Sequence, residues 1–219
     1  MRDPLSADEI RNSLLLSVTY IHGAAVVGDV AEFGTMSGRT ATILAQAIKQ
    51  HNSSRRLMLF DSFEGLPTST SAVDSCSPHV RSGVWSSGTC KGLTSQQLRD
   101  KCAEHLPNTQ IEIHEGWFAD TLRKLHGDTR FALIHIDSDL YKSAVDVLDY
   151  CFANRTISRG AAVHFDDWDC NQADPRFGER LAWRVMVDKF AVNFTDCGQY
   201  GWGSRKFIVH SYLHMDEGE

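Results

Sequence analysis

The sequence predicts an α/β fold: a doubly wound, mostly parallel sheet with an antiparallel C-terminal strand and a lid insertion. Strand-like and helix-like segments alternate along most of the chain. Two apolar, strand-like runs stop abruptly in aspartate, ALIHI before Asp137 and GAAVHF before Asp166 and Asp167. Because parallel strands end at one sheet edge, where such folds bind ligands, we expect these three carboxylates to converge there.

The N-terminal part predicts a helix followed by a βαβ unit. Residues 5–27 are helical in pattern, and Ser6 and Glu9 have the spacing of a capping box. GDVAEFG at 28–34 is the first strand, TMSGRTATILAQAIKQ turns into a helix, and RRLMLFDSF at 55–63 is the second strand. A right-handed crossover would make the two strands parallel.

The segment from about 66 to 107 differs in composition from the rest of the chain. It is rich in Ser, Thr and Gly, and only its latter part, 95–105, has a helical pattern. A stretch this long between strands is usually functional. We interpret it as a lid over the sheet edge with one packing helix.

The C-terminal part continues the alternation and ends in a hairpin. The predicted strands are 111–118, 131–137 and 161–167, the helices are 142–156 and 178–190, and FTDCG to KFIVHSY forms an antiparallel hairpin.

Composition indicates a single domain spanning 1–219 and excludes several classes of partner. Hydrophobic residues make up 42% and charged residues 23%, and the formal net charge is −6. The acidic balance argues against nucleic acid or an anionic membrane as partner. Without an apolar leader or spanning segment, a cytoplasmic location is expected. Cys76 and Cys90 could pair, although free thiols are the commoner outcome in the cytoplasm.

The first two strands end in residues suited to a nucleoside ligand. Glu32 and Gly34 begin a glycine turn, EFGTMSG, in which glycine lets a ligand approach the backbone. The pattern lacks the full GxGxxG fingerprint and could be only a tight turn. Asp61 ends the second strand, where an acid can bind both ribose hydroxyls. Gly116 and Trp117 follow the third strand and could lie against an adenine ring, although such a tryptophan more often packs in a core.

The aspartate cluster predicts a metal site. Adjacent buried carboxylates repel one another, and a hard cation such as Mg²⁺ resolves that conflict. The alternative for Asp166 and Asp167 is a helix cap and a surface charge. Asp139 could compete as a ligand or cap the helix near Tyr141. His135 and His164 are expected to be buried, hydrogen-bonded core residues.

Five strings in order, VAEFGTMSG, LFDSFEGLP, EGWFADTL, HIDSDLY and HFDDW, make the chain resemble the macrocin O-methyltransferase family over 28–168. The resemblance implies a class I methyltransferase fold that binds S-adenosylmethionine and Mg²⁺. It implies methyl transfer to a hydroxyl of a deoxysugar on a natural product, as in antibiotic tailoring, and a small glycosylated substrate. A homo-oligomer is also expected.

The resemblance also implies roles for single residues. Asp137, Asp166 and Asp167 would bind the metal, and Asp137 would be the general base, unless a lid residue or water takes the proton. Glu32, Gly34 and Ser37 would line the methionine side of the cofactor and Asp61 its ribose. Ser62, Gly116 and Trp117 complete the expected cofactor-binding set.

Other functions stay open at this point. A catechol-type O-methyltransferase would use the same metal logic on a phenolic diol. An NAD-linked oxidoreductase is permitted by the glycine turn, but the aspartates and the missing GxGxxG argue against it. A non-catalytic binding domain would not need all three carboxylates.

Overall fold

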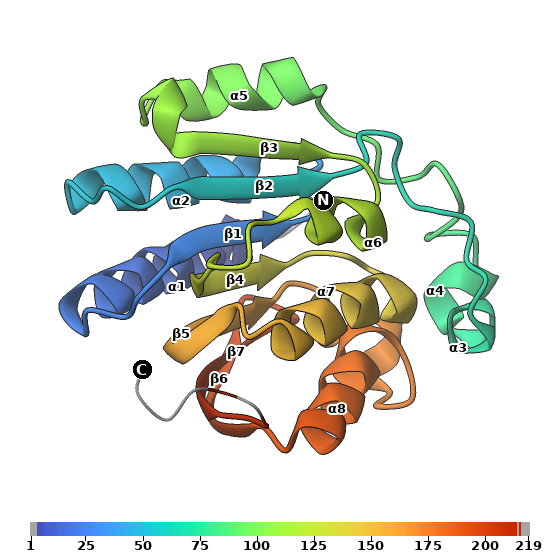
Figure 1. The fold of residues 1–219 in the computed structure, drawn as a ribbon. Helices are drawn as coiled ribbons and strands as arrows, with labels where there is room; N and C mark the ends of the chain where they lie inside the picture. The colour runs from blue at the N-terminus through green and yellow to red at the C-terminus, as the bar shows by residue number, and fades with distance from the viewer. Residues whose placement is uncertain (1–3, 214, 216–219) are drawn as a thin grey trace.

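The computed structural model describes residues 4–213 and 215, and its centre is one seven-stranded sheet. The strand order is β3-β2-β1-β4-β5-β7-β6 (Figure 1). The strands are β1 Asp29–Phe33, β2 Leu57–Asp61, β3 Ile111–Glu115, β4 Phe131–Ile136, β5 Ile157–Phe165, β6 Asn193–Tyr200 and β7 Ser204–Ser211. Strands β1 to β5 are parallel, and β7 pairs antiparallel with both β5 and β6. The predicted doubly wound sheet with an antiparallel C-terminal strand is confirmed.

Helices cover both faces of this sheet. The helices of the described chain are α1 Pro4–Gly23, α2 Arg39–Gln50, α3 Ala72–Cys76, α4 Pro78–Arg81, α5 Ser95–Ala103, α6 Phe118–Thr121, α7 Tyr141–Ala153 and α8 Gly178–Phe190, with short 3₁₀ turns η1 Asn108–Gln110, η2 Leu122–Lys124 and η3 Asn171–Ala173. Of these, α3 and α4 lie beyond the sheet edge rather than on a face (Figure 1). One core lies between the sheet and α1, α2 and α5, and the other between the sheet and α7 and α8.

The central strand β4 shows how the two cores share the sheet. All six of its residues are buried. Ile134 and Ile136 belong to the α7 and α8 core, whereas Leu133 belongs to the α1 and α2 core. A parallel strand covered on both faces must be apolar along its length, which is why FALIHI shows no polar alternation apart from one histidine.

Several element boundaries differ from the prediction. Helix α1 starts at Pro4 and stops at Gly23, so Ser6 lies inside it, and the Ser6 hydroxyl accepts a hydrogen bond from Trp202 N (3.0 Å). The predicted capping box at Ser6 is therefore wrong. Strand β3 ends at Glu115, because Gly116 takes φ 134° and the chain turns into α6.

The lid segment crosses the edge toward which the parallel strands point (Figure 1). It contains two helices, α3 and α4, that the sequence did not predict. Its outgoing and returning legs are paired by Leu66 N to Thr89 O (2.8 Å) and Gly88 N to Leu66 O (2.9 Å). The returning leg is also fixed to the glycine turn, because Leu93 N donates to Met36 O (2.8 Å).

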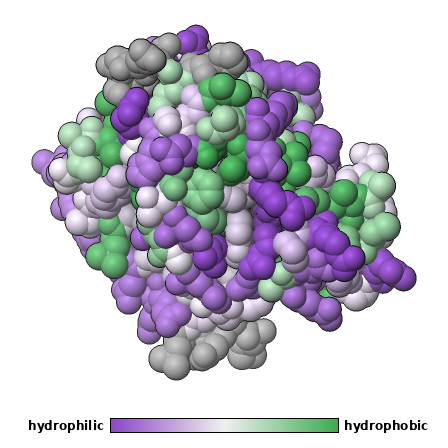
Figure 2. Space-filling view, turned by 90° about the horizontal axis from the view of Figure 1, so that it is seen from below, coloured by the Kyte–Doolittle hydropathy of each residue, from purple (hydrophilic) through white to green (hydrophobic). Residues whose placement is uncertain are grey.

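The surface is mixed in character. Seen from below, hydrophilic and hydrophobic residues are interspersed over the face shown in Figure 2. Within the described part of the chain, no helix combines the length and apolar character needed to cross a bilayer.

Gly34 joins the end of β1 to the end of β4. It has φ 90°, and a Cβ built on it would lie 1.9 Å from the carbonyl oxygen of Asp137. The Asp137 N–H also donates to Phe33 O (2.9 Å). Glycine is therefore required here because the backbone of Asp137 packs against it, whether or not a ligand also approaches the turn.

We therefore predict that Gly34→Ala destabilises the fold by at least about 2 kcal/mol, since it adds both positive-φ strain and a backbone clash. Urea unfolding followed by circular dichroism measures this. Gly127→Ala is the matched control, because a Cβ there meets open space, and it should change stability by less than about 0.5 kcal/mol. Equal stability of the two variants would contradict the account.

Candidate functional site

The three predicted aspartates meet at the ends of β4 and β5. Ile136 pairs with Phe165 in the parallel register, so the residues that follow, Asp137 and Asp166, leave the sheet side by side. The Asp166 N–H donates to Ile136 O (2.9 Å), which fixes this alignment. One carboxylate oxygen from each of Asp137, Asp166 and Asp167 lies within 4.8 Å of the others.

The negative charges of these three carboxylates repel one another. Asp166 and Asp167 are buried (1% and 8% exposed) and Asp137 is half-buried. Burial, followed by the charges of Asp166 and Asp167, raises the pKa of Asp137 well above its usual range. Converging carboxylate oxygens that repel one another are the donor set that Mg²⁺ or Mn²⁺ prefers. The residues present therefore fit a hard divalent cation.

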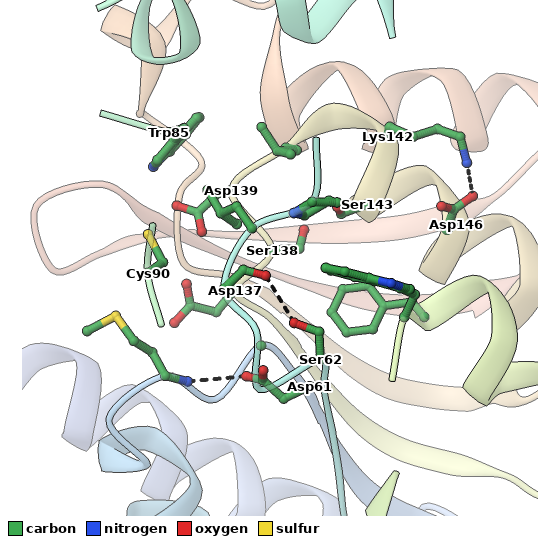
Figure 3. A pocket seen from close by; sticks show the side chains of 18 of the residues that line it. Asp61, Ser62, Trp85, Cys90, Asp137, Ser138, Asp139, Lys142, Ser143 and Asp146 are labelled. Carbon is green, nitrogen blue, oxygen red and sulfur yellow. Dashed lines mark hydrogen bonds and ion pairs between the residues drawn. The ribbon is translucent and has the colours of Figure 1, made fainter. Parts of the chain in front are cut away.

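A cavity of about 650 Å³ opens beside the cluster. Its wall is formed by the glycine turn, the end of β2, the segment 116–119, the loop between β4 and α7, and the lid (Figure 3). The predicted site residues that line it are Gly34, Ser37, Asp61, Ser62, Gly116, Trp117, Asp137 and Asp167. Residues at the ends of β1, β2 and β3 and residues that follow β4 and β5 therefore line the same cavity.

Asp61 lies in the cavity wall and also braces the glycine turn. Its Oδ2 accepts hydrogen bonds from Thr35 N (2.7 Å) and Thr35 Oγ1 (2.9 Å), and its Oδ1 accepts one from Phe63 N (2.7 Å). A carboxylate has about four acceptor positions, so Oδ1 retains capacity for a ligand hydroxyl. The sequence suggested the ligand role but not this bracing.

Glu32 is placed differently from the other predicted cofactor residues. It is fully buried and is not among the residues that line the cavity. Its Oε1 lies 3.1 Å from His135 Nδ1. Period-two alternation explains this, because Glu32 shares the α1 and α2 face with Val30, whereas Ala31 and Phe33 face the other core.

The two strand histidines are core residues, as expected. His135 and His164 are fully buried and neighbour each other across β4 and β5. His164 Nε2 lies 2.9 Å from Ser17 Oγ and its Nδ1 3.0 Å from Tyr200 OH. Burial lowers the pKa of His164 well below its usual range, which favours the neutral ring.

Asp139 does not cap α7, and the lid supplies the cap instead. Asp74 of α3, 1% exposed, accepts hydrogen bonds from Tyr141 N at Oδ1 (2.7 Å) and from Lys142 N at Oδ2 (3.1 Å). Burial raises the pKa of Asp74, and these two N–H groups oppose that rise. The predicted capping role of Asp139 is wrong, because the capping residue comes from a distant segment; Asp139 itself lines the cavity.

The lid contributes an apolar wall and a second anchor. Trp85, Leu66, Leu140 and Cys170 form a small buried cluster, and Trp85 lines the cavity. His79 N donates to Asn171 Oδ1 (3.0 Å), which joins α4 to η3. Cys76 and Cys90 are both exposed free thiols, so the pairing considered from the sequence does not occur.

Glu179 is a buried carboxylate that no sequence pattern indicated. It lies in the first turn of α8 and is 0% exposed. Burial, followed by the charge of Asp167, raises its pKa well above the usual range. The sequence gave no indication that this residue is buried. A single acidic residue in the first turn of a helix is usually exposed to solvent, where it interacts favourably with the positive end of the helix dipole.

Comparison with known proteins gives consistent matches. The profile of the family described as macrocin-O-methyltransferase (TylF) matches residues 10–182. A curated relative from Streptomyces olivaceus, 8-demethyl-8-(2,3-dimethoxy-alpha-L-rhamnosyl)-tetracenomycin-C 4'-O-methyltransferase, is 29% identical over 163 residues, which are 72% of this chain and 59% of the relative. The chain thus spans about three fifths of that protein's length.

Two solved structures share the fold. The O-methyltransferase NovP superposes with a TM-score of 0.76 at 21% identity, over 92% of this chain and 79% of NovP. CalS11, a calicheamicin methyltransferase, gives a TM-score of 0.68 at 24% identity, over 90% of this chain and 79% of CalS11. These likenesses confirm the class I methyltransferase fold.

We predict that Asp74→Ala loosens the lid, because it leaves two amides at the start of α7 without their carboxylate. The expected loss of stability is about 1–2 kcal/mol, as for other removed helix caps. Hydrogen exchange at Tyr141 and Lys142, with limited proteolysis of residues 66–90, measures the release. Asp74→Asn keeps one acceptor oxygen, so its stability and exchange rates should lie between those of the parent and those of Asp74→Ala. Parental exchange rates in Asp74→Ala would show that the lid is held by other contacts.

Proposed function

Because the chain belongs to the macrocin O-methyltransferase family, we propose that it transfers a methyl group from S-adenosylmethionine to a sugar hydroxyl on a natural product, with Mg²⁺ bound at its aspartates. The observation that carries this proposal is the convergence of Asp137, Asp166 and Asp167 beside the cavity that the glycine turn lines. A cofactor pocket alone would suit many methyltransferases, whereas a carboxylate cluster at its rim suits those that act on hydroxyl groups with a metal.

The cofactor would occupy the part of the cavity formed by β1, β2 and β3. S-adenosylmethionine supplies an electrophilic methyl group on a positively charged sulfur. Gly38 is the N-cap of α2 and provides no capping side chain, so the first amides of that helix are available to the methionine carboxylate. Asp61 would accept from a ribose hydroxyl at Oδ1, and Gly116 and Trp117 would lie beside the adenine.

The acceptor would bind between the aspartates and the lid. This part of the wall combines the polar Asp139 with the apolar Leu66 and Trp85. A sugar offers hydroxyl groups to the first and a largely apolar ring face to the second. The name of the Streptomyces olivaceus relative describes methylation of a rhamnosyl group, which supports a deoxysugar acceptor here.

Asp137, Asp166 and Asp167 would hold the cation, because their oxygens already lie within 4.8 Å of one another. A bound divalent cation would keep these carboxylates ionised and, as a Lewis acid, lower the pKa of an adjacent acceptor hydroxyl.

The chain's own contribution is positioning and proton removal. Asp137 lines the cavity and would accept the hydroxyl proton at a carboxylate oxygen. The hydroxyl oxygen would gain the methyl group as the methyl–sulfur bond breaks, and S-adenosylhomocysteine would be the leaving group. In-line attack requires that donor and acceptor be held rigidly, which can contribute several kcal/mol to the lowered barrier. The paired legs of the lid and its anchors through Asp74 and His79 would close the acceptor side against water.

Other expectations from the sequence stay predictions. These are a homo-oligomer, a cytoplasmic location, and a single domain spanning 1–219 with residues 66–107 as its lid.

We predict that EDTA lowers methyl transfer at least about a hundredfold and that added Mg²⁺ restores it, since the Lewis-acid contribution is worth several kcal/mol. The assay follows labelled methyl transfer from S-adenosylmethionine to a rhamnosyl-tetracenomycin, the kind of acceptor that the relative's name describes, with a simple catechol as the comparison acceptor. Asp166→Asn should lose both activity and the response to Mg²⁺ while keeping parental circular dichroism.

Full activity in EDTA would remove the metal from the proposal. Methylation of the catechol but not of the glycoside would favour a catechol-type enzyme instead.

A further inference from the structure

Glu179 has a placement that the proposed reaction leaves unexplained. Its carboxylate is completely buried and does not line the cavity, so it touches neither cofactor nor acceptor space. Burial of a carboxylate is costly unless hydrogen bonds compensate for the lost water. The partners that provide this compensation therefore indicate what the residue does.

Those partners belong to the two loops that carry the metal-binding aspartates. Glu179 Oε1 accepts from Ser138 N (3.1 Å) and lies 3.4 Å from Ser138 Oγ. Glu179 Oε2 accepts from Asp167 N (3.0 Å). One oxygen thus holds the residue directly after Asp137, and the other holds Asp167 itself.

The start of α8 is itself anchored, which makes this carboxylate a fixed point. The neighbouring Arg180 pairs with Asp169 and donates from Nη1 to Ala173 O (2.7 Å). Its guanidinium also lies over the ring of Trp168, 5.3 Å from the centroid. The helix start is therefore tied to the loop that follows Asp167.

We propose that Glu179 is a positioning residue that sets the spacing between the two loops that follow β4 and β5, and thereby the geometry of the aspartate site for its cation. This inference rests on the metal site proposed above. Glu179 Oε1 accepts from the Ser138 amide and Glu179 Oε2 accepts from the Asp167 amide, so one carboxylate bridges the two loops.

Two substitutions separate this role from a simple effect of charge. Glu179→Gln removes the charge and replaces one acceptor oxygen with an NH₂ group, which would face a backbone N–H. Glu179→Asp keeps the charge but is one methylene shorter, so it cannot reach both loops. Asp188→Asn, on the same helix but exposed, is the matched control for losing one negative charge.

The test is titration of the purified full chain with Mn²⁺ alone, followed by the electron paramagnetic resonance signal of the free ion. Both Glu179 variants should bind Mn²⁺ at least about tenfold more weakly than the parent, as expected for partners that orient metal ligands. Asp188→Asn should stay within about twofold of the parent. Circular dichroism checks folding, and if Glu179→Gln does not fold, Glu179→Asp against the parent decides the question.

Parental affinity in Glu179→Asp would overturn the inference, because charge alone would then account for any effect of Glu179→Gln. Failure of the parent chain to bind Mn²⁺ would overturn the metal site as well as the inference. Parental binding with unchanged variants would overturn the inference and leave the proposed function standing.

Discussion

Repulsion among carboxylates gathered at one sheet edge is the constraint on which this part of the molecule depends. The parallel register of β4 and β5 forces Asp137 and Asp166 to emerge together, and Asp167 follows directly. Glu179 adds a fourth carboxylate behind them. Buried like charges at such distances are tolerated when protons, N–H donors or a cation offset them. The backbone donors around Glu179 are one part of that compensation, and a divalent cation is the part we propose.

At the same edge of the sheet, the glycine turn after β1 lies against the aspartate site after β4 and β5. Gly34 lets the end of β1 lie against the carbonyl group of Asp137, so the glycine turn and the aspartate site share a backbone contact. Asp61 braces that turn from β2. The lid is attached to both aspartate-bearing loops, through Asp74 at the start of α7 and through His79 at η3. A movement of the lid would therefore displace the two loops beside which the acceptor hydroxyl is expected to bind.

The features that could be predicted from sequence follow simple periodic rules. Apolar runs ending in Asp137 and Asp166 revealed strands and their shared edge, because buried parallel strands are apolar throughout. The burial of His135 and His164 followed from their position within such runs. Family strings provided the proposed cofactor-binding roles of the glycine turn and Asp61, which composition and spacing alone left open.

What could not be predicted depends on contacts between distant segments. Asp74 caps α7 across 67 residues, and Glu179 bridges loops whose neighbourhood appears only after folding. The lid helices α3 and α4 have five and four residues, too short for an apolar period to register. The family resemblance implies a cofactor role for Glu32, which stays a prediction; its burial in the α1 and α2 core follows from the pleat of β1 and could not be read from its place before the glycine turn.

The ends of β4 and β5 are proposed to form a site for a divalent cation. A crystal structure of the chain grown with Mn²⁺ and S-adenosylhomocysteine, with anomalous data collected at the manganese edge, tests it most directly. We predict an anomalous peak among the carboxylates of Asp137, Asp166 and Asp167, about 2.0–2.3 Å from their oxygens. A fully occupied cofactor pocket with no peak among these three residues would contradict the account.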